Sequence, residues 1–177
     1  MTTEIGLFYG STTGMTEDVA FRLEALVREQ FPEVEITAIN IIDLEDPRDM
    51  FLNDKIILGL PTWNYGEFQD DWEMVIDKIA DVDLHGKRIA LFGLGDQVGY
   101  PEYYLDALGM IAEQLRAQGA QFVGEWPTAG YKFERSKALL PNGNFIGLAL
   151  DEDSQPELTD ERLKTWLDQL IPLLLTA

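Results

Sequence analysis

Three short stretches of the chain are almost continuously apolar, at residues 4–9, 56–60 and 88–92. Runs of this length and character are typical of strands that are covered on both faces of a sheet. A fourth stretch, 34–39, alternates apolar and polar residues and therefore predicts a partly exposed strand. A fifth strand begins at 121–124.

The fifth strand is interrupted. Residues 126–144 break its pattern, and the apolar character resumes at 145–150. The sequence thus predicts a last strand that is divided by an insertion of about 20 residues.

Between the strands, apolar residues recur at the spacing of an α-helix. Pro32 closes the first of these segments, Gly119 is expected to stop the third, and Thr159 is expected to cap the last. Residues 43–53 are polar and predict a connection with at most a short helix. The apolar stripes are Val19, Leu23, Leu26 and Val27; Trp72, Val75, Ile76 and Ile79; Leu105, Leu108, Ala112 and Leu115; and Leu163, Trp166, Leu167, Leu170 and Ile171.

Strands that alternate with helices predict an α/β fold with a doubly wound parallel sheet. The length of 177 residues suits one such domain, so residues 1–177 are taken as a single domain. Ligands bind to these sheets at the carboxyl ends of the strands. Three loops meet that description, at 10–16, 61–66 and 93–101.

Charge is the extreme feature of the composition. With 32 acidic and 13 basic residues, the formal net charge is −19 and the pI is about 4.1. Nucleic acids and anionic membranes require a basic face, so neither is an expected partner. The sequence shows no Cys, no leader and no apolar run of the ~18 residues that a membrane span needs, and we expect a cytoplasmic protein.

The loop 10–16 leads into the N-terminus of a helix, where free amides and the helix dipole favour an anion. It is not a Walker loop, because Gly10 and Gly14 are too close together and Met15 stands where Lys is required. It fits either a monophosphate held by neutral donors or an ordinary turn whose hydroxyls cap the helix. The candidate hydroxyl donors are Ser11, Thr12, Thr13 and Thr16.

Two aromatic residues, Trp63 and Tyr100, follow neighbouring strands. Together they can sandwich a flat ring, although each alone fits a surface aromatic. Asp96 is either an acceptor for a ring N–H or a solvated turn residue. Gly93 and Gly95 imitate part of a dinucleotide fingerprint but lack its third Gly. With the phosphate loop, these residues indicate a phosphorylated planar heterocycle.

Five motifs closely resemble those of the long-chain flavodoxins, and the resemblance runs over essentially the whole chain. It implies a flavodoxin-like five-stranded sheet in the order 2-1-3-4-5 with helices on both faces, and FMN as cofactor. The insertion corresponds to the long-chain insertion, whose proposed role is partner recognition. The motifs are GSTTGMT at 10–16, PTWNYGE at 61–67, GLGDQVGY at 93–100, GLALDED at 147–153 and LTDER at 158–162.

The resemblance also implies roles for single residues. The first loop would bind the FMN phosphate, Trp63 would stack on the inner face of the isoalloxazine and Tyr100 on its outer face. The Asn64–Tyr65 peptide matches one that reorients on reduction, and Asp96 matches a contact with the pyrimidine edge. Met15 replaces a frequent Lys, and Tyr65 stands where relatives often have an aliphatic residue or Gly, which bears on the stability of the semiquinone. The expected cofactor-binding residues are Ser11, Thr12, Thr13, Gly14, Met15, Thr16, Pro61, Thr62, Trp63, Asn64, Tyr65, Gly66, Gly93, Gly95, Asp96 and Tyr100.

The function that the resemblance implies is low-potential one-electron transfer, with FMN cycling between semiquinone and hydroquinone and no catalytic residue in the protein. The implied partners are a flavin-dependent NADP reductase or similar redox proteins with basic surfaces, and we expect a monomer. No base occurs at 56–77 or 89–115. Acids in these windows are expected to surround the flavin edge, lower the hydroquinone potential and steer basic partners. They are Glu67, Asp70, Asp71, Glu73 and Asp77, and Asp96, Glu102, Asp106 and Glu113.

Two other functions belong to similar folds. An FMN-dependent NAD(P)H:quinone oxidoreductase needs room for its substrates on the flavin face that Tyr100 would cover. A phospho-accepting receiver domain needs an acidic pair after the first strand and an Asp at the end of the third, where Leu60, Pro61 and Thr62 stand. The sequence lacks both acidic features.

Overall fold

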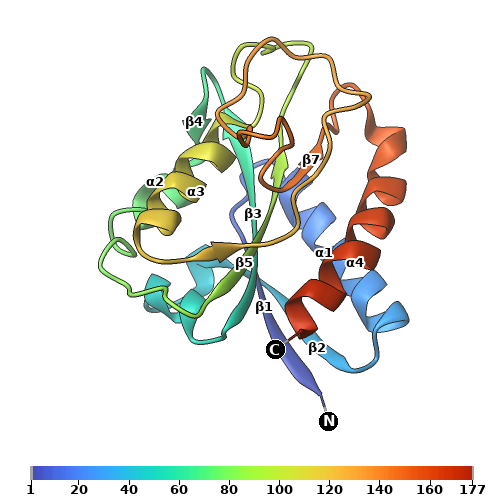
Figure 1. The fold of residues 1–177 in the computed structure, drawn as a ribbon. Helices are drawn as coiled ribbons and strands as arrows, with labels where there is room; N and C mark the ends of the chain where they lie inside the picture. The colour runs from blue at the N-terminus through green and yellow to red at the C-terminus, as the bar shows by residue number, and fades with distance from the viewer. Residues whose placement is uncertain (1, 177) are drawn as a thin grey trace.

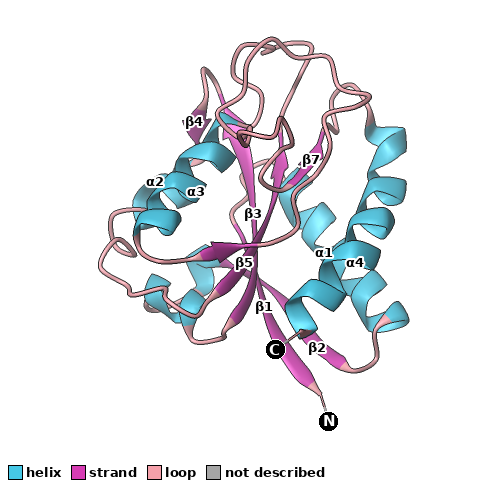
Figure 2. Cartoon of the chain, in the orientation of Figure 1, coloured by secondary structure: helices cyan, strands magenta, loops and turns pink. Residues whose placement is uncertain are grey.

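A parallel sheet between two layers of helices forms the centre of the computed structural model, which describes residues 2–176 (Figures 1 and 2). Its strands follow the order β2-β1-β3-β5-β6, which confirms the predicted order of the five strands. The apolar runs form the inner strands because both of their faces are covered by helices. The strand bounds are β1 Thr3–Tyr9, β2 Val34–Asn40, β3 Lys55–Trp63, β5 Arg88–Leu94, β6 Gln121–Phe122 and β7 Leu148–Leu150.

The last strand is divided as predicted. Both of its parts pair in parallel with β5: β6 beside Arg88 and Ile89, and β7 beside Phe92–Leu94. The insertion between them arches over the top of the molecule in Figure 1. It is packed rather than extended, because Tyr131 and Phe133 lie with their ring centroids 6.0 and 5.7 Å from that of the buried Tyr104.

Within the described residues, four α-helices cover the sheet, with α1 and α4 on one face and α2 and α3 on the other (Figure 1). All of the predicted stripe residues are buried except Leu26, which is half-buried against the core. The helices are α1 Met15–Gln30, α2 Asp70–Val75, α3 Asp106–Ala117 and α4 Thr159–Leu175, with 3₁₀ turns η1 Ile41–Asp43, η2 Pro47–Phe51 and η3 Pro156–Leu158.

The helix α2 is shorter than its apolar stripe. It ends at Val75, although Ile76 and Ile79 are buried as predicted. The backbone carbonyls of these two residues accept hydrogen bonds from the side chains of Gln114 and Gln118 on the α3 side, both at 2.8 Å. These side chains therefore satisfy acceptors that would otherwise favour further helical turns.

Thr159 does not cap α4 as predicted. The 3₁₀ turn η3 precedes the helix directly, so Leu158 is already in the αR region and Thr159 is the first α-helical residue. Its hydroxyl is buried without a hydrogen-bond partner among the described residues. A cap requires an extended residue in front of the helix, and Pro156, which favours the first position of a helical turn, removes that possibility.

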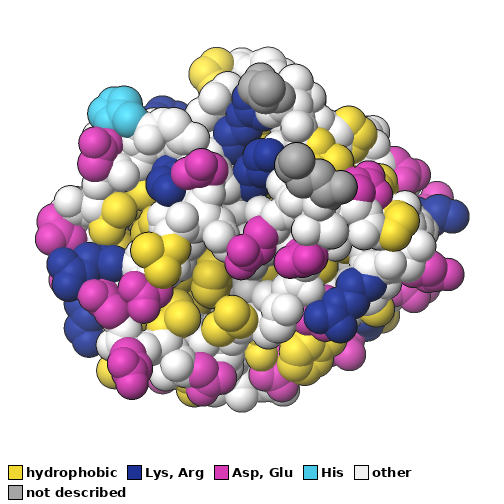
Figure 3. All heavy atoms as spheres, turned by 90° about the horizontal axis from the view of Figure 1, so that it is seen from below, with side chains coloured by type: hydrophobic (Ala, Val, Ile, Leu, Met, Phe, Trp, Pro, Cys, Tyr) yellow, Lys and Arg dark blue, Asp and Glu magenta, His cyan; other side chains and the backbone are white. Residues whose placement is uncertain are grey.

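Two basic residues lie at the end of the sheet opposite the predicted binding loops. Lys55 begins β3 and Arg88 begins β5. Figure 3 views the molecule from below, and Lys and Arg side chains lie among the acidic ones on that face. Within residues 2–176, no helix is long and apolar enough to cross a membrane.

Candidate cofactor site

The three loops that the sequence singles out meet in one cavity at the carboxyl ends of the strands. Its volume is about 290 Å³, and the segment after β7 also contributes to its wall. The predicted residues that line it are Ser11, Thr12, Thr13, Met15, Thr16, Pro61, Thr62, Trp63, Asn64, Gly95, Asp96 and Tyr100.

Four predicted residues do not line this cavity: Gly14, Tyr65, Gly66 and Gly93. The sequence predicts Gly93 in a loop, but β5 continues to Leu94 and Gly93 is buried inside the strand. A Cβ on Gly93 would lie 3.2 Å from side-chain atoms of Leu105 and Leu108. Gly93 therefore allows α3 to pack closely on the sheet and has no direct place in the cavity.

The phosphate-loop candidate has the backbone of an anion cradle. Gly14 precedes α1 in the left-handed region, with φ of 90°. The first bond from the helix back to the loop runs from the Asp18 amide to the Gly14 carbonyl at 3.0 Å. The amides of Met15, Thr16 and Glu17 consequently lack an intrahelical acceptor, as at any helix N-terminus.

Hydroxyl groups of the loop are partly engaged already. The Ser11 hydroxyl oxygen accepts a hydrogen bond from the Gly14 amide at 3.2 Å, and the Thr12 hydroxyl oxygen accepts one from Gln69 Nε2 at 2.9 Å. Both oxygens act as acceptors within the protein, so both hydroxyl protons stay available for an outside acceptor. Thr16 also lines the cavity, although it is almost completely buried.

The segment 61–66 is a strand end and a tight hairpin, whereas the sequence predicts a loop throughout. The strand β3 continues to Trp63, which pairs with Glu67 of the antiparallel strand β4, Glu67–Phe68. Asn64 and Gly66 adopt positive φ values of 48° and 85°. Trp63 therefore lies at the carboxyl end of β3, where pairing with β4 holds its backbone more firmly than a free loop would.

Gly66 packs directly on a buried carboxyl group. A Cβ at this position would lie 2.7 Å from Asp106 Oδ2, so only Gly fits. Burial raises the pKa of the Asp106 carboxyl, and the hydrogen bond from the Lys137 amide at 2.8 Å opposes that shift. Asp106 links the hairpin to the insertion and is not part of the exposed acidic surface expected from the sequence.

Tyr65 projects from the hairpin and is 71% exposed. Its ring meets those of Tyr103 and Tyr100 edge to face, with centroid distances of 5.7 and 6.4 Å. Tyr100 is 45% exposed and Trp63 is half-buried. The cavity thus has aromatic walls from both neighbouring loops.

Asp96 is a turn residue in this structure. Its Oδ1 accepts hydrogen bonds from the amides of Val98 and Gly99 at 3.1 and 2.7 Å, which is the pattern of an Asx turn. No hydrogen bond is formed by Oδ2 within the described part of the chain. Asp96 also lines the cavity, so its second oxygen is the one that a ligand N–H can reach.

Two acids of the cavity wall, Glu152 and Asp153, are not among the residues predicted from the sequence. They follow β7, so the rule that ligands bind at the carboxyl ends of strands is the signal that could have identified them, but it was applied to three other loops only. Burial is the main cause of the raised pKa of Asp153, and the nearby Asp96, Asp151 and Glu152 carboxylates add to it. No Lys or Arg of the described chain lines this cavity.

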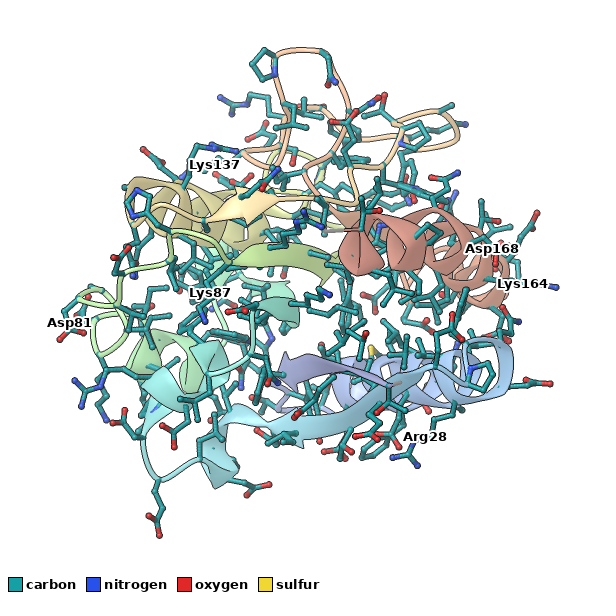
Figure 4. All side chains as sticks on the ribbon, turned by 60° about the horizontal axis from the view of Figure 1, so that its bottom comes forward. Arg28, Asp81, Lys87, Lys137, Lys164 and Asp168 are labelled. Atoms are coloured by element: carbon teal, nitrogen blue, oxygen red, sulfur yellow. The ribbon has the colours of Figure 1, made fainter. Side chains whose placement is uncertain are left out.

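The acidic windows are less uniform than the sequence suggests. Glu102 forms an ion pair with Arg135 of the insertion at 3.3 Å, and Asp71 accepts a hydrogen bond from Gln69. Figure 4 shows Lys137 of the insertion beside α3. The exposed acids are Glu67, Asp70, Glu73 and Asp77 near α2, Glu113 on α3, and Glu102, which stays exposed in its ion pair.

Comparisons with known proteins agree on one family. The family profile described as "Flavodoxin" matches residues 7–166. A Flavodoxin of Synechocystis sp. is 47% identical over 97% of this chain and 98% of its own, and Flavodoxin 2 of Escherichia coli is 47% identical over 94% of each chain. The structure is similar to that of a mutant flavodoxin of Fusobacterium nucleatum bound to flavin mononucleotide, with a TM-score of 0.87, 28% identity and 98% of both chains covered.

Proposed function

This chain belongs to the flavodoxin family, and we propose that it holds FMN in the cavity described above through the residues that line it. It is an FMN-binding electron carrier rather than an enzyme. FMN, when bound, supplies the one-electron chemistry, and the protein provides binding, orientation and electrostatics.

The phosphate end of FMN suits the loop 10–16. The free amides at the start of α1 and the hydroxyl protons of Ser11 and Thr12 are neutral donors. The helix dipole adds a favourable field for the anion. This supply of donors supports a phosphate subsite that needs no basic side chain at Met15.

The ring end suits the aromatic walls. Trp63 at the end of β3 and Tyr100 on the opposite loop offer flat faces. Asp96 Oδ2, which forms no hydrogen bond within the described residues, offers an acceptor for a pyrimidine N–H. The Asn64–Tyr65 peptide lies in a hairpin where Asn64 already has a positive φ, so we retain it as the segment that responds to the redox state. The Tyr65 contacts with Tyr100 and Tyr103 oppose such a movement.

Negative charge close to the ring supports a low potential. Asp96, Glu152 and Asp153 line the cavity and no base of the described chain lines it, so adding an electron to the ring there is electrostatically unfavourable. Arg22 Nη2 lies 3.8 Å from Glu152 Oε2 and offsets part of that charge. We assign the low potential mainly to Asp96 and Asp153, which form no ion pair within the described residues. The exposed acids near α2 are better placed to steer basic redox partners, among which a flavin-dependent NADP reductase is the proposed donor.

The observation that carries the proposal is that one cavity combines the loop 10–16, which offers hydrogen-bond donors to an anion without a Lys or Arg, with the aromatic side chains of Trp63 and Tyr100. A stepwise redox titration, followed by visible absorbance, tests it. Two separate one-electron steps with a low potential for the second are expected, and direct two-electron reduction would contradict the carrier function. Steady-state NADPH oxidation with quinone in the absence of an added reductase should be undetectable. A cytoplasmic location and a monomeric state stay predictions.

A further inference from the structure

Gln69 is a fully buried polar residue that lies behind the phosphate-loop candidate without lining the cavity. It precedes α2, and its Oε1 accepts a hydrogen bond from the Trp72 amide at 3.4 Å. Its Nε2 donates to Thr12 Oγ1 at 2.9 Å and to Asp71 Oδ2 at 2.8 Å. Gln69 therefore joins the first loop of the site to the segment that follows the ring-side hairpin.

The orientation of the Gln69 amide follows from its partners. The Asp71 carboxylate can only accept and the Trp72 amide can only donate, so the NH₂ group must face Asp71. One of its two protons is used there, and the other goes to Thr12 Oγ1. Every donor and the oxygen of this side chain are engaged, as a buried amide requires.

This arrangement determines what the Thr12 hydroxyl can do. Because its oxygen accepts the proton from Gln69, its own proton must point elsewhere. Thr12 is exposed and lines the cavity, so its hydroxyl proton can point into the cavity. A phosphate offers only acceptor oxygens to such a donor.

The packing around Gln69 holds this geometry in place. A Cβ on Gly10 would lie 2.7 Å from both Gln69 Oε1 and the Trp72 ring. The Trp72 ring is itself fixed, since its Nε1 donates to the Gly59 carbonyl at 3.2 Å. The start of the phosphate loop thus rests directly on Gln69, and only Gly at position 10 permits that approach.

We propose that Gln69 is a positioning residue for phosphate binding, which orders the Thr12 hydroxyl as a donor to the FMN phosphate. In a loop without Lys or Arg, an additional ordered donor contributes more than it would beside a base. Asp71 acts one step further back by fixing the orientation of the Gln69 amide. This inference rests on the proposed phosphate subsite.

The test compares FMN with riboflavin, which lacks the phosphate, on the full-length protein freed of flavin. Gln69→Met removes the donors at similar volume, and we expect it to weaken FMN binding about tenfold while riboflavin binding changes less than about twofold. Gln69→Glu turns the bond around, because the carboxylate accepts the Thr12 proton. We expect that variant to weaken FMN binding by about a hundredfold.

Two further variants separate positioning from charge and from folding. Asp71→Asn should weaken FMN binding about threefold, because the long bond from the Trp72 amide, at 3.4 Å, is then left to hold the orientation of the Gln69 amide. Asp70→Asn removes the same charge from the neighbouring exposed residue and should leave the FMN-to-riboflavin affinity ratio unchanged. Thr12→Val should reproduce the Gln69→Met loss, and the double variant Gln69→Met/Thr12→Val should lose no more than either alone.

The results of these variants separate a failure of the positioning role of Gln69 from a failure of the phosphate subsite. Equal weakening of FMN and riboflavin by Gln69→Met would reduce Gln69 to a structural role and overturn the inference. An unchanged ratio in both Gln69 variants, with a lowered ratio in Thr12→Val, would also overturn it while leaving the phosphate subsite intact. If Ser11→Ala, Thr12→Val and Thr13→Val all left the ratio unchanged, the phosphate subsite itself would fail. If a Gln69 variant did not fold, Asp71→Asn against Asp70→Asn would still decide the question.

Discussion

Gln97 and Asp151 lie 54 residues apart in the chain, and both the amide and the side-chain Nε2 of Gln97 donate to Asp151 Oδ2, at 3.0 and 2.9 Å. Both residues are buried. Gln97 also accepts a hydrogen bond from the Lys132 amide at 2.6 Å. One side chain therefore joins the ring-side loop to the segment after β7 and to the insertion.

Replacing Gln97 with Leu should loosen these three segments together. The change leaves a buried carboxylate with fewer donors, and we expect a loss of about 1–3 kcal/mol in the free energy of unfolding. Urea unfolding measures it, and FMN affinity should fall as well because Asp96 is the neighbouring residue. Val98→Ala, at an exposed position in the same loop, is the matched control. Equal stability in the two variants would contradict the linking role of Gln97.

The aromatic walls provide a second prediction. Trp63→Leu and Tyr100→Leu should each cost about 1–3 kcal/mol of FMN binding free energy, through lost ring contact. Fluorescence titration of the flavin-free protein measures this loss. Phe21→Leu, at a 50% exposed aromatic on α1 that does not line the cavity, should have no effect on affinity. An unchanged affinity for both wall variants would place the ring elsewhere.

The third prediction concerns the potential of the second electron. Asp153→Asn removes a negative charge from the cavity wall and should raise this potential by tens of millivolts, where about 59 mV is a tenfold change in a one-electron equilibrium. Potentiometric titration measures the shift. Asp168→Asn, which removes the same charge on the outer side of α4 (Figure 4), should shift it far less. Equal shifts would mean that net charge, rather than the cavity acids, sets the potential.

Exposed acids provide the fourth prediction, which separates steering from potential. Neutralising Glu67 and Asp70 should slow electron transfer with a basic partner and flatten its dependence on ionic strength. Stopped-flow kinetics over a range of salt concentrations measures both effects. Glu102 is a poorer target than its sequence window suggests, because Arg135 already pairs with it. If the salt dependence were unchanged, partner docking would lie on another face.

Asp106 provides a prediction about pH. Burial raises the pKa of its carboxyl, so above the ordinary aspartate pKa of about 3.9 the folded chain holds this proton more firmly than the unfolded chain. The contribution of Asp106 to stability therefore falls as the pH rises from that value through the raised pKa. In Asp106→Asn this loss is absent, and the variant should gain stability relative to the parent as the pH rises. Urea unfolding at several pH values checks this, with the exposed Asp77→Asn as control.

Much of the fold could be predicted because burial imprints it on the sequence. The strands β1, β3 and β5 are largely apolar since helices cover both faces, and the interruption of the last strand is equally visible. The length of α2 was not predictable, because it depends on Gln114 and Gln118 from another part of the chain. The cap expected at Thr159 failed because Pro156 starts a 3₁₀ turn in front of it.

Some features of the candidate site could also be predicted from the sequence, and others could not. Hydroxyl-rich and aromatic loops at the ends of strands were recognisable, since those residue types are unusual there. The Asx turn of Asp96, the burial of Asp106 and the bonds of Gln69 depend on contacts in the folded chain and have no periodic signature. Glu152 and Asp153 belong to the motif GLALDED at 147–153, but the motif does not show that they line the cavity. That position follows from the pairing of β7 with β5 in the folded chain.

The pairing of the divided strand has a consequence for how the chain can be shortened. Phe122 is aligned with Ile89 and Leu148 with Phe92, so the two positions of β5 between them correspond to Val123 and Gly147. Excision of 124–146 would join Val123 to Gly147 with every remaining residue in its present alignment. The excision would leave one uninterrupted edge strand, but it would uncover Tyr104, release Asp106 and Gln97 from backbone amides of the insertion, and remove four residues of the buried core, Trp126, Ala138, Phe145 and Ile146.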